Sequence, residues 1–373
     1  MSRTLVITND FPTRRGGIET FVWSLVERFP ADEVVVYTAS MPGDRAFDDS
    51  VPVTVLRDPD RMLLPRPAVA KRVQGAFVEH GCDRVLFGAS APLGLLAPGL
   101  RRLGAERIVA LTHGHEVWWA RTPGARHALR RIGEHCDVLT YVSDWCRDQI
   151  APALTETAVA RMRPLSPGVD PERFRPDCGG DLVRSTLGIS GTDPVVVCTA
   201  RMVARKGQDT LVRVWPRVLA QVPSARLLLV GGGPRLAAIT EAAASLPSVH
   251  VVGSRPWAEI PAYTDAGDVF AMPCRTRLGG LEPEAYGIVF LEAAACGLPV
   301  VVGASGGAPE TVMDGESGYV VDPTDDDAVC SALADLLSDP ALSRRMGQVG
   351  RDWAGRHSWD AAAAEARRLL AGP

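Results

Sequence analysis

The chain alternates short apolar runs with stretches of helical spacing along almost its whole length. In the first half the apolar runs are rich in Val, Ile and Leu and show no regular polar alternation, which is typical of parallel strands covered on both faces. Stretches with apolar residues at helical spacing separate these runs, as in residues 68–81 and 126–136. The strands predicted for this half are 4–10, 33–39, 83–89, 107–113 and 138–143.

A segment dense in Pro, Gly and Asp, residues 163–181, interrupts the pattern and reads as a connection between domains. Beyond it the alternation begins again. The sequence therefore predicts an α/β protein of two doubly wound domains in tandem, residues 1–168 and 169–356, with a helical segment at about 357–373. Ligands of such sheets bind at the carboxyl ends of the strands, so we expect the site in a central cleft that both domains face. The strands predicted for the second domain are 195–202, 226–234, 249–254, 268–273, 298–304 and 318–322.

Composition and charge exclude several classes of protein. The formal net charge of −4 argues against a nucleic-acid partner. No apolar run approaches the ~18–20 residues that span a bilayer, and the first residues read as a strand and not as a secretory leader. The eight cysteines show no CxxC spacing, which favours free thiols over disulfides or a zinc site. We therefore expect a cytoplasmic protein.

The segment EAYGIVFLE places a carboxylate at each end of an otherwise uncharged run, at Glu284 and Glu292. Eight residues of helix rise ~12 Å, which is more than the ~5–9.5 Å between the two carboxyls of a glycosidase. The spacing suits contacts with two ends of one elongated ligand; a capping glutamate followed by an ion-paired one is the alternative. Gly287 lies near the start of the predicted helix, where free N–H groups can bind an anion.

Positive charge stands in the loop 199–211, which joins a predicted strand to a helix and contains Arg201, Arg205 and Lys206. Arginine can bind phosphate through a forked contact and lysine acts as a point charge. Lys206 is one of only two lysines in the chain, the other being Lys71. The loop therefore indicates a phosphate-containing ligand, although a solvated basic turn would give the same pattern.

The first domain offers weaker signals. Gly16 and Gly17 lie between a predicted strand and helix without completing GxGxxG, and the later VGGGP is too short to indicate NAD. His113 and His115, two residues apart at a strand end, lack a third ligand at convincing spacing, so we predict no metal site. A histidine facing the cleft is the preferred interpretation, and a structural histidine is the alternative.

Together these pieces resemble the retaining glycosyltransferases of family 4, which have the GT-B fold of two Rossmann-like domains. The resemblance covers essentially the whole chain. Within the family, segments such as NDFP and THGHEVWW look like the actinobacterial phosphatidylinositol mannosyltransferases that act on phosphatidylinositol monomannoside with GDP-mannose. The motifs that carry it are RRGGIE, THGHE, SPGVDPERF, ARMVARKGQD, LLLVGGGP, DVFAMP, EAYGIVFLEAAACGLPVV and GGAPE.

The resemblance implies a role for each candidate donor residue. Arg201 and Lys206 would hold the donor diphosphate, Glu292 would accept ribose hydroxyls and Glu284 a sugar hydroxyl. The remaining donor contacts would come from Gly16 and Gly17 (phosphates), Ser254 and Arg255 (base), the backbone of Gly287, Ile288 and Val289, and one of His113 and His115 (transferred sugar). The resemblance also implies that the helix at about 357–373 packs back on the first domain.

The resemblance further implies transfer of a hexose with retained configuration, without a metal or other cofactor. The diphosphate charge would be neutralised by Arg201, Lys206 and the helix end at Gly287. A lipid acceptor would require a membrane-facing patch at the inner face of the plasma membrane, where arginines suit anionic headgroups; a solvated helix face is the alternative. The residues predicted for this patch are Arg121, Arg126, Arg130, Arg131, Lys71 and Arg72.

Three other functions remain open at this point. A family 4 enzyme could use a UDP- or GDP-sugar on a small soluble acceptor, such as a natural-product or inositol derivative. A non-catalytic nucleotide-sugar-binding protein would keep the donor residues without transfer. An NAD-dependent oxidoreductase is disfavoured because no GxGxxG follows the first strand.

Overall fold

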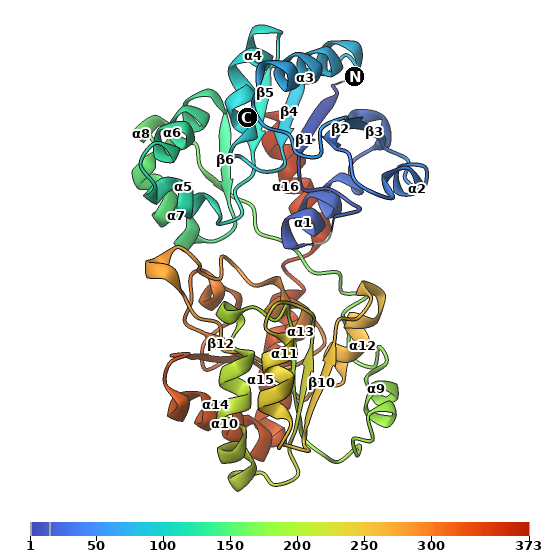
Figure 1. Cartoon of the computed structure of the whole chain (residues 1–373), viewed down its shortest axis with the longest axis vertical. Helices are drawn as coiled ribbons and strands as arrows, with labels where there is room; N and C mark the ends of the chain where they lie inside the picture. Colours follow the sequence, from blue (N-terminus) through green and yellow to red (C-terminus); the bar gives the residue numbers. More distant parts are fainter. Residues whose placement is uncertain (1, 15, 373) are drawn as a thin grey trace. The chain divides into compact units, whose positions relative to one another are not determined.

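The computed structural model describes residues 2–14 and 16–372, which divide into two compact units. The first unit runs up to Pro167 and includes the chain from Trp359 onward, and the second spans Gly168–Ser358. Each unit is a parallel sheet with helices packed against it (Figure 1).

The first unit contains a seven-stranded parallel sheet in the order β3-β2-β1-β4-β5-β6-β7. Its inner strands are almost completely buried because they consist of Val, Leu and Ile with helices on both faces. The strands are β1 (Thr4–Thr8), β2 (Val34–Ala39), β3 (Thr54–Asp58), β4 (Arg84–Phe87), β5 (Arg107–Ala110), β6 (Val138–Tyr141) and β7 (Arg163–Pro164). The helices are α1 (Gly17–Val26), α2 (Asp44–Asp48), α3 (Pro67–Glu79), α4 (Ala97–Arg102), α5 (Glu116–Arg121), α6 (Ala125–His135), α7 (Asp144–Ile150), α8 (Glu156–Ala160) and α16 (Trp359–Ala371), with short 3₁₀ turns at Ala31–Glu33, Leu93–Leu96 and Ala151–Ala153.

The C-terminal helix α16 belongs to this first unit, where it packs beside α1 (Figure 1). The rings of Phe21 and Trp359 lie 5.6 Å apart. At the other end of α16, Arg107 Nε donates a 2.9 Å hydrogen bond to the carbonyl of Leu369. The apolar face of α16 is buried, so the last helix of the chain completes the core of its first unit.

The second unit contains a six-stranded parallel sheet in the order β10-β9-β8-β11-β12-β13. Its core includes the fully buried Trp215, whose indole N–H donates to Ser248 Oγ at 2.9 Å. The strands are β8 (Val195–Thr199), β9 (Arg226–Val230), β10 (Val249–Gly253), β11 (Val269–Met272), β12 (Val300–Gly303) and β13 (Gly318–Val321). The helices are α9 (Gly180–Thr186), α10 (Gln208–Gln221), α11 (Leu236–Ala243), α12 (Ile260–Asp265), α13 (Ile288–Ala295), α14 (Asp326–Ser338) and α15 (Pro340–Ala354), with 3₁₀ turns η4 (Ala204–Lys206), η5 (Trp257–Glu259), η6 (Leu278–Gly280) and η7 (Ala308–Thr311).

The strand order places β8 and β11 side by side at the middle of this sheet. The strand order reverses direction there, since β9 follows β8 on one side and β12 follows β11 on the other. The loops after β8 and β11 therefore meet at the carboxyl edge, where doubly wound sheets bind their ligands. Over the described residues, no helix is both long and apolar enough to cross a membrane.

Candidate active site

An ion pair between two loops of the second unit is the centre of the candidate site. Lys206 Nζ, in the turn after β8, lies 2.7 Å from Glu284 Oε2, in the loop that precedes α13. Arg205 Nε lies 3.6 Å from the same oxygen. Both Glu284 Oε2 and Arg205 Nε are buried without a partner at hydrogen-bond angles, so charge attraction holds the three groups together. The two motifs that the sequence predicts to act together are thus in direct contact.

The two glutamates have opposite protonation tendencies. Burial alone raises the pKa of Glu284, but the nearby charges of Lys206 and Arg205 outweigh it, so the pKa is lowered from 4.5. Glu292 is also buried, with 3% of its surface exposed, and burial raises its pKa to about 8 against weaker attraction from Arg173 and Lys206. No hydrogen bond to the Glu292 carboxyl is found from the described residues. The site therefore holds one carboxylate that is charged, Glu284, and one carboxyl whose pKa lies near neutral pH, Glu292.

A close backbone approach fixes the cationic turn. Gly207 follows Lys206 with φ +78°, and a Cβ there would lie 2.1 Å from the carbonyl oxygen of Pro273, just after β11. Only glycine fits this left-handed, crowded position. The Arg275 N–H donates a 2.8 Å hydrogen bond to the Arg205 carbonyl, which ties the two loops together a second time. Lys206 is held against the end of β11 by these contacts.

The loop after β12 fixes the other partner of the ion pair. The backbone N–H of Glu284 donates to Ser305 Oγ at 3.1 Å, and the Gly307 N–H donates to the Glu284 carbonyl at 2.9 Å. Thr276 Oγ1 lies 2.9 Å from Ser305 Oγ and extends the network to the segment after β11. Three strand-end loops therefore position the Glu284 carboxylate. Ser305 was not predicted as a site residue; the small residues of GASGG, after a predicted strand, were its only signal.

Helix α13 begins directly after Gly287, which caps it with φ +90° and ψ +62°. A Cβ at this position would lie 2.7 Å from two carbons of the Phe290 ring, so the left-handed conformation and the space both require glycine. The N–H groups of the first turn, which include those of Ile288 and Val289, have no carbonyl inside the helix to bind. They form a positive helix end a few residues from Glu284.

The predicted phosphate and base contacts lie at the neighbouring loop. The Met202 N–H donates to the carbonyl of Gly232 at 2.8 Å, so the triple-glycine segment after β9 packs on the loop that carries Arg201. Arg201 is exposed, and no ion pair or hydrogen bond engages its guanidinium from the described residues. Ser254 and Arg255 follow β10 and are exposed; the Arg255 guanidinium lies 5.5 Å from the centre of the Tyr263 ring.

The first unit holds the histidine candidates in a turn at the end of β5. His113 Nε2 lies 2.6 Å from the Gly88 carbonyl, and His115 Nε2 lies 3.3 Å from the Ala91 carbonyl. In both rings Nε2 therefore donates, and Nδ1 is the acceptor in the neutral tautomer. Burial lowers the pKa of His113, and Glu116 opposes this only in part. His115 Nδ1 is buried and has no hydrogen-bond partner over the described residues.

Glu116 organises this turn and was not predicted as a site residue. Its carboxylate is fully buried and accepts hydrogen bonds from Ser90 Oγ (2.9 Å) and from the His113 N–H (3.0 Å). The Gly114 N–H donates to it at 3.2 Å, and His115 Nε2 lies 3.3 Å from its other oxygen. A glutamate directly before the apolar run VWW, in HEVWW, was the available signal. Gly16 and Gly17 are exposed at the start of α1 in the same unit.

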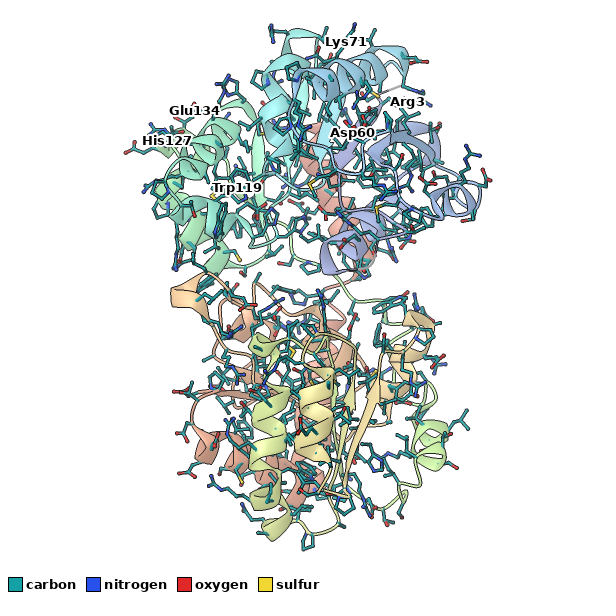
Figure 2. All side chains as sticks on the ribbon, in the orientation of Figure 1. Arg3, Asp60, Lys71, Trp119, His127 and Glu134 are labelled. Atoms are coloured by element: carbon teal, nitrogen blue, oxygen red, sulfur yellow. The ribbon has the colours of Figure 1, made fainter. Side chains whose placement is uncertain are left out.

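The six residues predicted for a membrane or acceptor patch differ in how far their charge is neutralised. Arg72 donates to both oxygens of Asp58 at 2.8 Å and to Asp60 at 2.7 Å, so its charge is neutralised within the protein. Lys71 is exposed on α3 (Figure 2). On α6, Arg130 Nε lies 3.4 Å from Glu134 Oε1, and Arg131 is exposed.

Arg121 and Arg126 line a groove of about 670 Å³ formed by α5, α6, α7 and the following 3₁₀ turn. Arg121 donates to Gln149 Oε1 and Arg126 to the Pro152 carbonyl, so both guanidinium groups are oriented by uncharged oxygens. His127, labelled on α6 in Figure 2, and Asp148 line the same groove. The groove is thus more basic than acidic. In the part of the chain that the structure describes, no group of three or more His, Cys, Asp or Glu residues is arranged to hold a metal ion.

A known family of glycosyltransferases matches each half of the chain. The family "Glycosyltransferase Family 4" matches residues 15–173, and "Glycosyl transferases group 1" matches residues 181–353. Among solved structures, HepE of Anabaena in complex with UDP superimposes with a TM-score of 0.82 at 17% identity, over 100% of both chains. Sucrose-phosphate synthase of Thermosynechococcus elongatus gives 0.79 at 22% identity, also over 100% of both chains. The fold is therefore GT-B, as the sequence predicts.

Other relatives are more similar to this chain in sequence than these solved structures are, and they also match it over nearly the full length of both proteins. The chain is 48% identical to the GDP-mannose-dependent alpha-(1-6)-phosphatidylinositol monomannoside mannosyltransferase of Mycolicibacterium smegmatis, over 99% of this chain and 98% of the relative. It is 44% identical to the Mycobacterium tuberculosis protein of the same name, over 100% and 99%. A Corynebacterium glutamicum relative, whose name specifies a monoacylated acceptor, is 40% identical over 94% and 92%.

The fold and the matched domains define a glycosyltransferase with the GT-B fold. More narrowly, the chain belongs to glycosyltransferase family 4, in the group of the actinobacterial phosphatidylinositol monomannoside mannosyltransferases.

Proposed function

We propose that this protein transfers mannose from GDP-mannose to a phosphatidylinositol monomannoside, with retention of configuration and without a metal ion. The observation that carries the proposal is the ion pair of Lys206 with the buried Glu284 beside the start of α13, in a chain with full-length relatives named for this reaction. In this pair, the cation Lys206 can bind a phosphate and the carboxylate Glu284 can accept a hydrogen bond from a sugar hydroxyl. The sugar phosphate of such a donor has a phosphate at one end and sugar hydroxyls at the other.

The donor would lie along the carboxyl edge of the second sheet. Lys206 and Arg201 would bind the diphosphate, together with the first-turn N–H groups of α13 at Gly287, Ile288 and Val289. The charged Glu284 would accept a hydroxyl of the mannose. In the first unit, Gly16 and Gly17 would permit close approach to the phosphates.

At the nucleoside end, Glu292 would accept the ribose hydroxyls, and Ser254 and Arg255 would contact the base. The absence of a protein hydrogen bond to the Glu292 carboxyl, over the described residues, supports this role. A buried carboxyl without a partner is costly unless a ligand satisfies it.

Departure of the nucleoside diphosphate places negative charge on its outer phosphate. Lys206, Arg201 and the α13 helix end would stabilise this charge more strongly in the transition state than in the bound donor, which is the role a magnesium ion has in other transferases. We propose that the acceptor hydroxyl attacks on the face that the diphosphate leaves, without a covalent intermediate on the protein, which retains the configuration. The Nδ1 acceptor of His113 or His115 would contact a sugar hydroxyl.

A panel of donors tests the assignment. Thermal shift and calorimetry with GDP-mannose, GDP-glucose and UDP-glucose should show the strongest stabilisation by GDP-mannose. Arg255→Ala should weaken binding of GDP more than it weakens binding of mannose phosphate, because Arg255 is proposed to contact the base only. Preferential binding of a UDP-sugar would contradict the proposed donor.

We also propose that the arginines of α6 bring the enzyme to anionic lipids at the inner face of the plasma membrane. The exposed Arg131 and the groove arginine Arg126 supply unneutralised charge, whereas Arg72 does not. Vesicles of anionic phospholipid should sediment the wild-type protein, and the double variant Arg126→Ala/Arg131→Ala should remain in the supernatant at moderate salt. Equal sedimentation of both proteins would overturn this part of the proposal.

A further inference from the structure

Glu116 has no part in the proposed transfer, although it directly follows the two histidine candidates in the sequence. It is the first residue of α5 in the first unit, and it is fully buried. A buried carboxyl is costly unless its oxygens are hydrogen-bonded, and groups from two different strand ends meet this need. The fold thus places the Glu116 carboxyl between two loops.

Each oxygen of the Glu116 carboxyl faces a different loop or ring. Oε2 accepts hydrogen bonds from the backbone N–H groups of His113 (3.0 Å) and Gly114 (3.2 Å), in the turn after β5. Oε1 accepts from Ser90 Oγ at 2.9 Å, in the loop after β4, and lies 3.3 Å from His115 Nε2. One carboxyl therefore fixes the backbone of the histidine turn and ties that turn to the neighbouring strand end.

The two histidine rings contact the same loop after β4. His113 Nε2 lies 2.6 Å from the Gly88 carbonyl, and His115 Nε2 lies 3.3 Å from the Ala91 carbonyl. Gly88 is itself closely packed, because a Cβ there would lie 2.7 Å from a side-chain atom of β1. All three polar side chains of the segment HGHE thus contact the loop after β4, and Glu116 supplies the one carboxyl among them.

The second nitrogen of each ring has a different environment. His115 Nδ1 is enclosed by protein and has no partner among the described residues, so a ligand could reach it only if side chains moved. His113 is only partly buried, and no hydrogen bond to its Nδ1 is found from the residues that the structure describes. The Phe21 ring lies edge-on to the His113 ring, with centroids 5.2 Å apart, and helps to hold it. Of the two Nδ1 atoms, that of His113 is therefore the one left for a ligand.

We propose that Glu116 is a positioning residue for mannosyl transfer, which holds the turn after β5 so that His113 Nδ1 accepts a hydroxyl of the transferred sugar. The proposal rests on the proposed function, because it takes the sugar to lie against this turn. Glu116 does not touch the sugar, since its carboxyl is enclosed. The Gly88 carbonyl can only accept, so the neutral His113 ring keeps its proton on Nε2 and has a lone pair on Nδ1 for the hydroxyl.

The change Glu116→Gln shows how much the turn depends on the carboxyl. One oxygen becomes an NH₂ group that cannot accept, so either the two backbone N–H groups or Ser90 and His115 lose their acceptor. A displacement of about 1 Å in a positioned group can cost about 10²-fold in rate. The turn should move by less than that, because the contacts of both rings with the loop after β4 remain. We therefore expect kcat to fall by about tenfold or more.

Steady-state kinetics and calorimetry separate this role from a loss of fold. Glu116→Gln should lower kcat while the affinity for GDP changes by less than about twofold, because the proposed nucleotide contacts lie in the second unit. Glu106→Gln, which changes an exposed carboxyl directly before β5 in the same unit, should keep the wild-type kcat. A wild-type kcat in the Glu116→Gln variant would overturn the proposal.

A double-variant cycle shows whether Glu116 acts through His113. If it does, adding Glu116→Gln to an enzyme that already carries His113→Gln should lower kcat by no more than about twofold. A purely structural role would give the same loss in both backgrounds. The full tenfold loss in the His113→Gln background would therefore overturn the proposal.

Ser90→Ala tests the same link with a smaller change that leaves the Glu116 carboxyl in place. It removes only the hydrogen bond from Ser90 Oγ to Oε1, so we expect kcat to fall by about twofold to tenfold, and not to fall further in the His113→Gln background. An unchanged kcat in the folded Ser90→Ala variant would contradict the role of the loop after β4. Failure of the wild-type protein to transfer mannose would instead contradict the proposed function itself.

Discussion

Glu284 and Glu292 lie eight residues apart and occupy different electrostatic environments. Two cations face Glu284 directly, so its carboxylate is charged although it is buried. Glu292 has only distant attraction from Arg173 and Lys206, so desolvation decides its pKa. A pair of glutamates that looks symmetric in sequence thus provides a permanent charge at one position and a titratable acceptor at the other.

The raised pKa of Glu292 predicts a particular dependence of stability on pH. The folded protein keeps this proton up to about pH 8, whereas the unfolded chain loses it near pH 4.5. The free energy of unfolding should therefore decrease as pH rises from about 4.5 to about 8. Glu284, with its lowered pKa, contributes in the opposite sense and only below pH 4.5.

Urea titrations of the wild type and of Glu292→Gln between pH 5 and 9 measure this effect. The variant should lack the part of the decrease that Glu292 causes, since its amide does not titrate. Identical slopes for both proteins would show that Glu292 is not protonated in the folded state.

Lys206 is expected to matter more for turnover than any other side chain of the site. Lys206→Ala removes the cation nearest to Glu284 and to the proposed diphosphate, so we expect kcat to fall by about 10²-fold or more. The melting temperature should fall too, because the buried Glu284 carboxylate keeps only Arg205 as a partner.

The matched control is Lys71→Ala, which changes the other lysine of the chain, exposed on α3 in the first unit. That variant should keep the wild-type rate with a water-dispersed acceptor. Near-normal transfer by the folded Lys206→Ala variant would count against the assigned role of the ion pair.

At the scale of elements, most strands were predictable and the contacts between their loops were not. The apolar runs of Val, Leu and Ile match β1, β2, β4, β5, β6 and every strand of the second sheet. The edge strand β3 (Thr54–Asp58) was missed because it is short and only half buried, so it lacks a continuous apolar run. Lys206 and Glu284 were expected to share a ligand, but their direct ion pair depends on two loops that only the folded sheet brings together.

The contacts of Glu116 could not be predicted from the sequence for the same reason. The buried Glu116 carboxylate binds groups from two separate strand ends, and local spacing gives no sign of Ser90 as a partner. Periodicity reports which face of an element is buried, whereas such pairs depend on the order of strands in the sheet.

The start of α13 provides a test at the level of one element. Gly287→Ala places a methyl group 2.7 Å from the Phe290 ring at a φ of +90°, so the first turn must rearrange. We expect GDP affinity to fall by about tenfold or more, together with a loss of roughly 1–3 kcal/mol in stability. Gly75→Ala, in the middle of α3 with open space around its Cβ, should leave affinity unchanged and raise stability slightly. Equal GDP affinity for the two variants would contradict a role of this helix end in donor binding.

At the scale of the whole molecule, the chain builds two parallel sheets and uses the strand-end loops of both for candidate site residues. The second unit contributes an ion pair, a helix end and a glycine-rich loop, all at one edge of its sheet. The first unit contributes a histidine turn organised by Glu116, and its core is completed by α16 from the far end of the chain. We propose that, in this member of family 4, the second unit binds the nucleotide of the donor, whereas the first unit binds the acceptor and contacts the transferred sugar.

The most direct test of the proposed mechanism is mannosyl transfer by the purified protein in the presence of EDTA. GDP-mannose and phosphatidylinositol monomannoside should give GDP and a dimannosylated lipid at the same rate with and without the chelator, and NMR of the new linkage should show the α configuration of the donor. A product of inverted configuration, or activity that disappears with EDTA and returns with magnesium, would contradict the proposed mechanism.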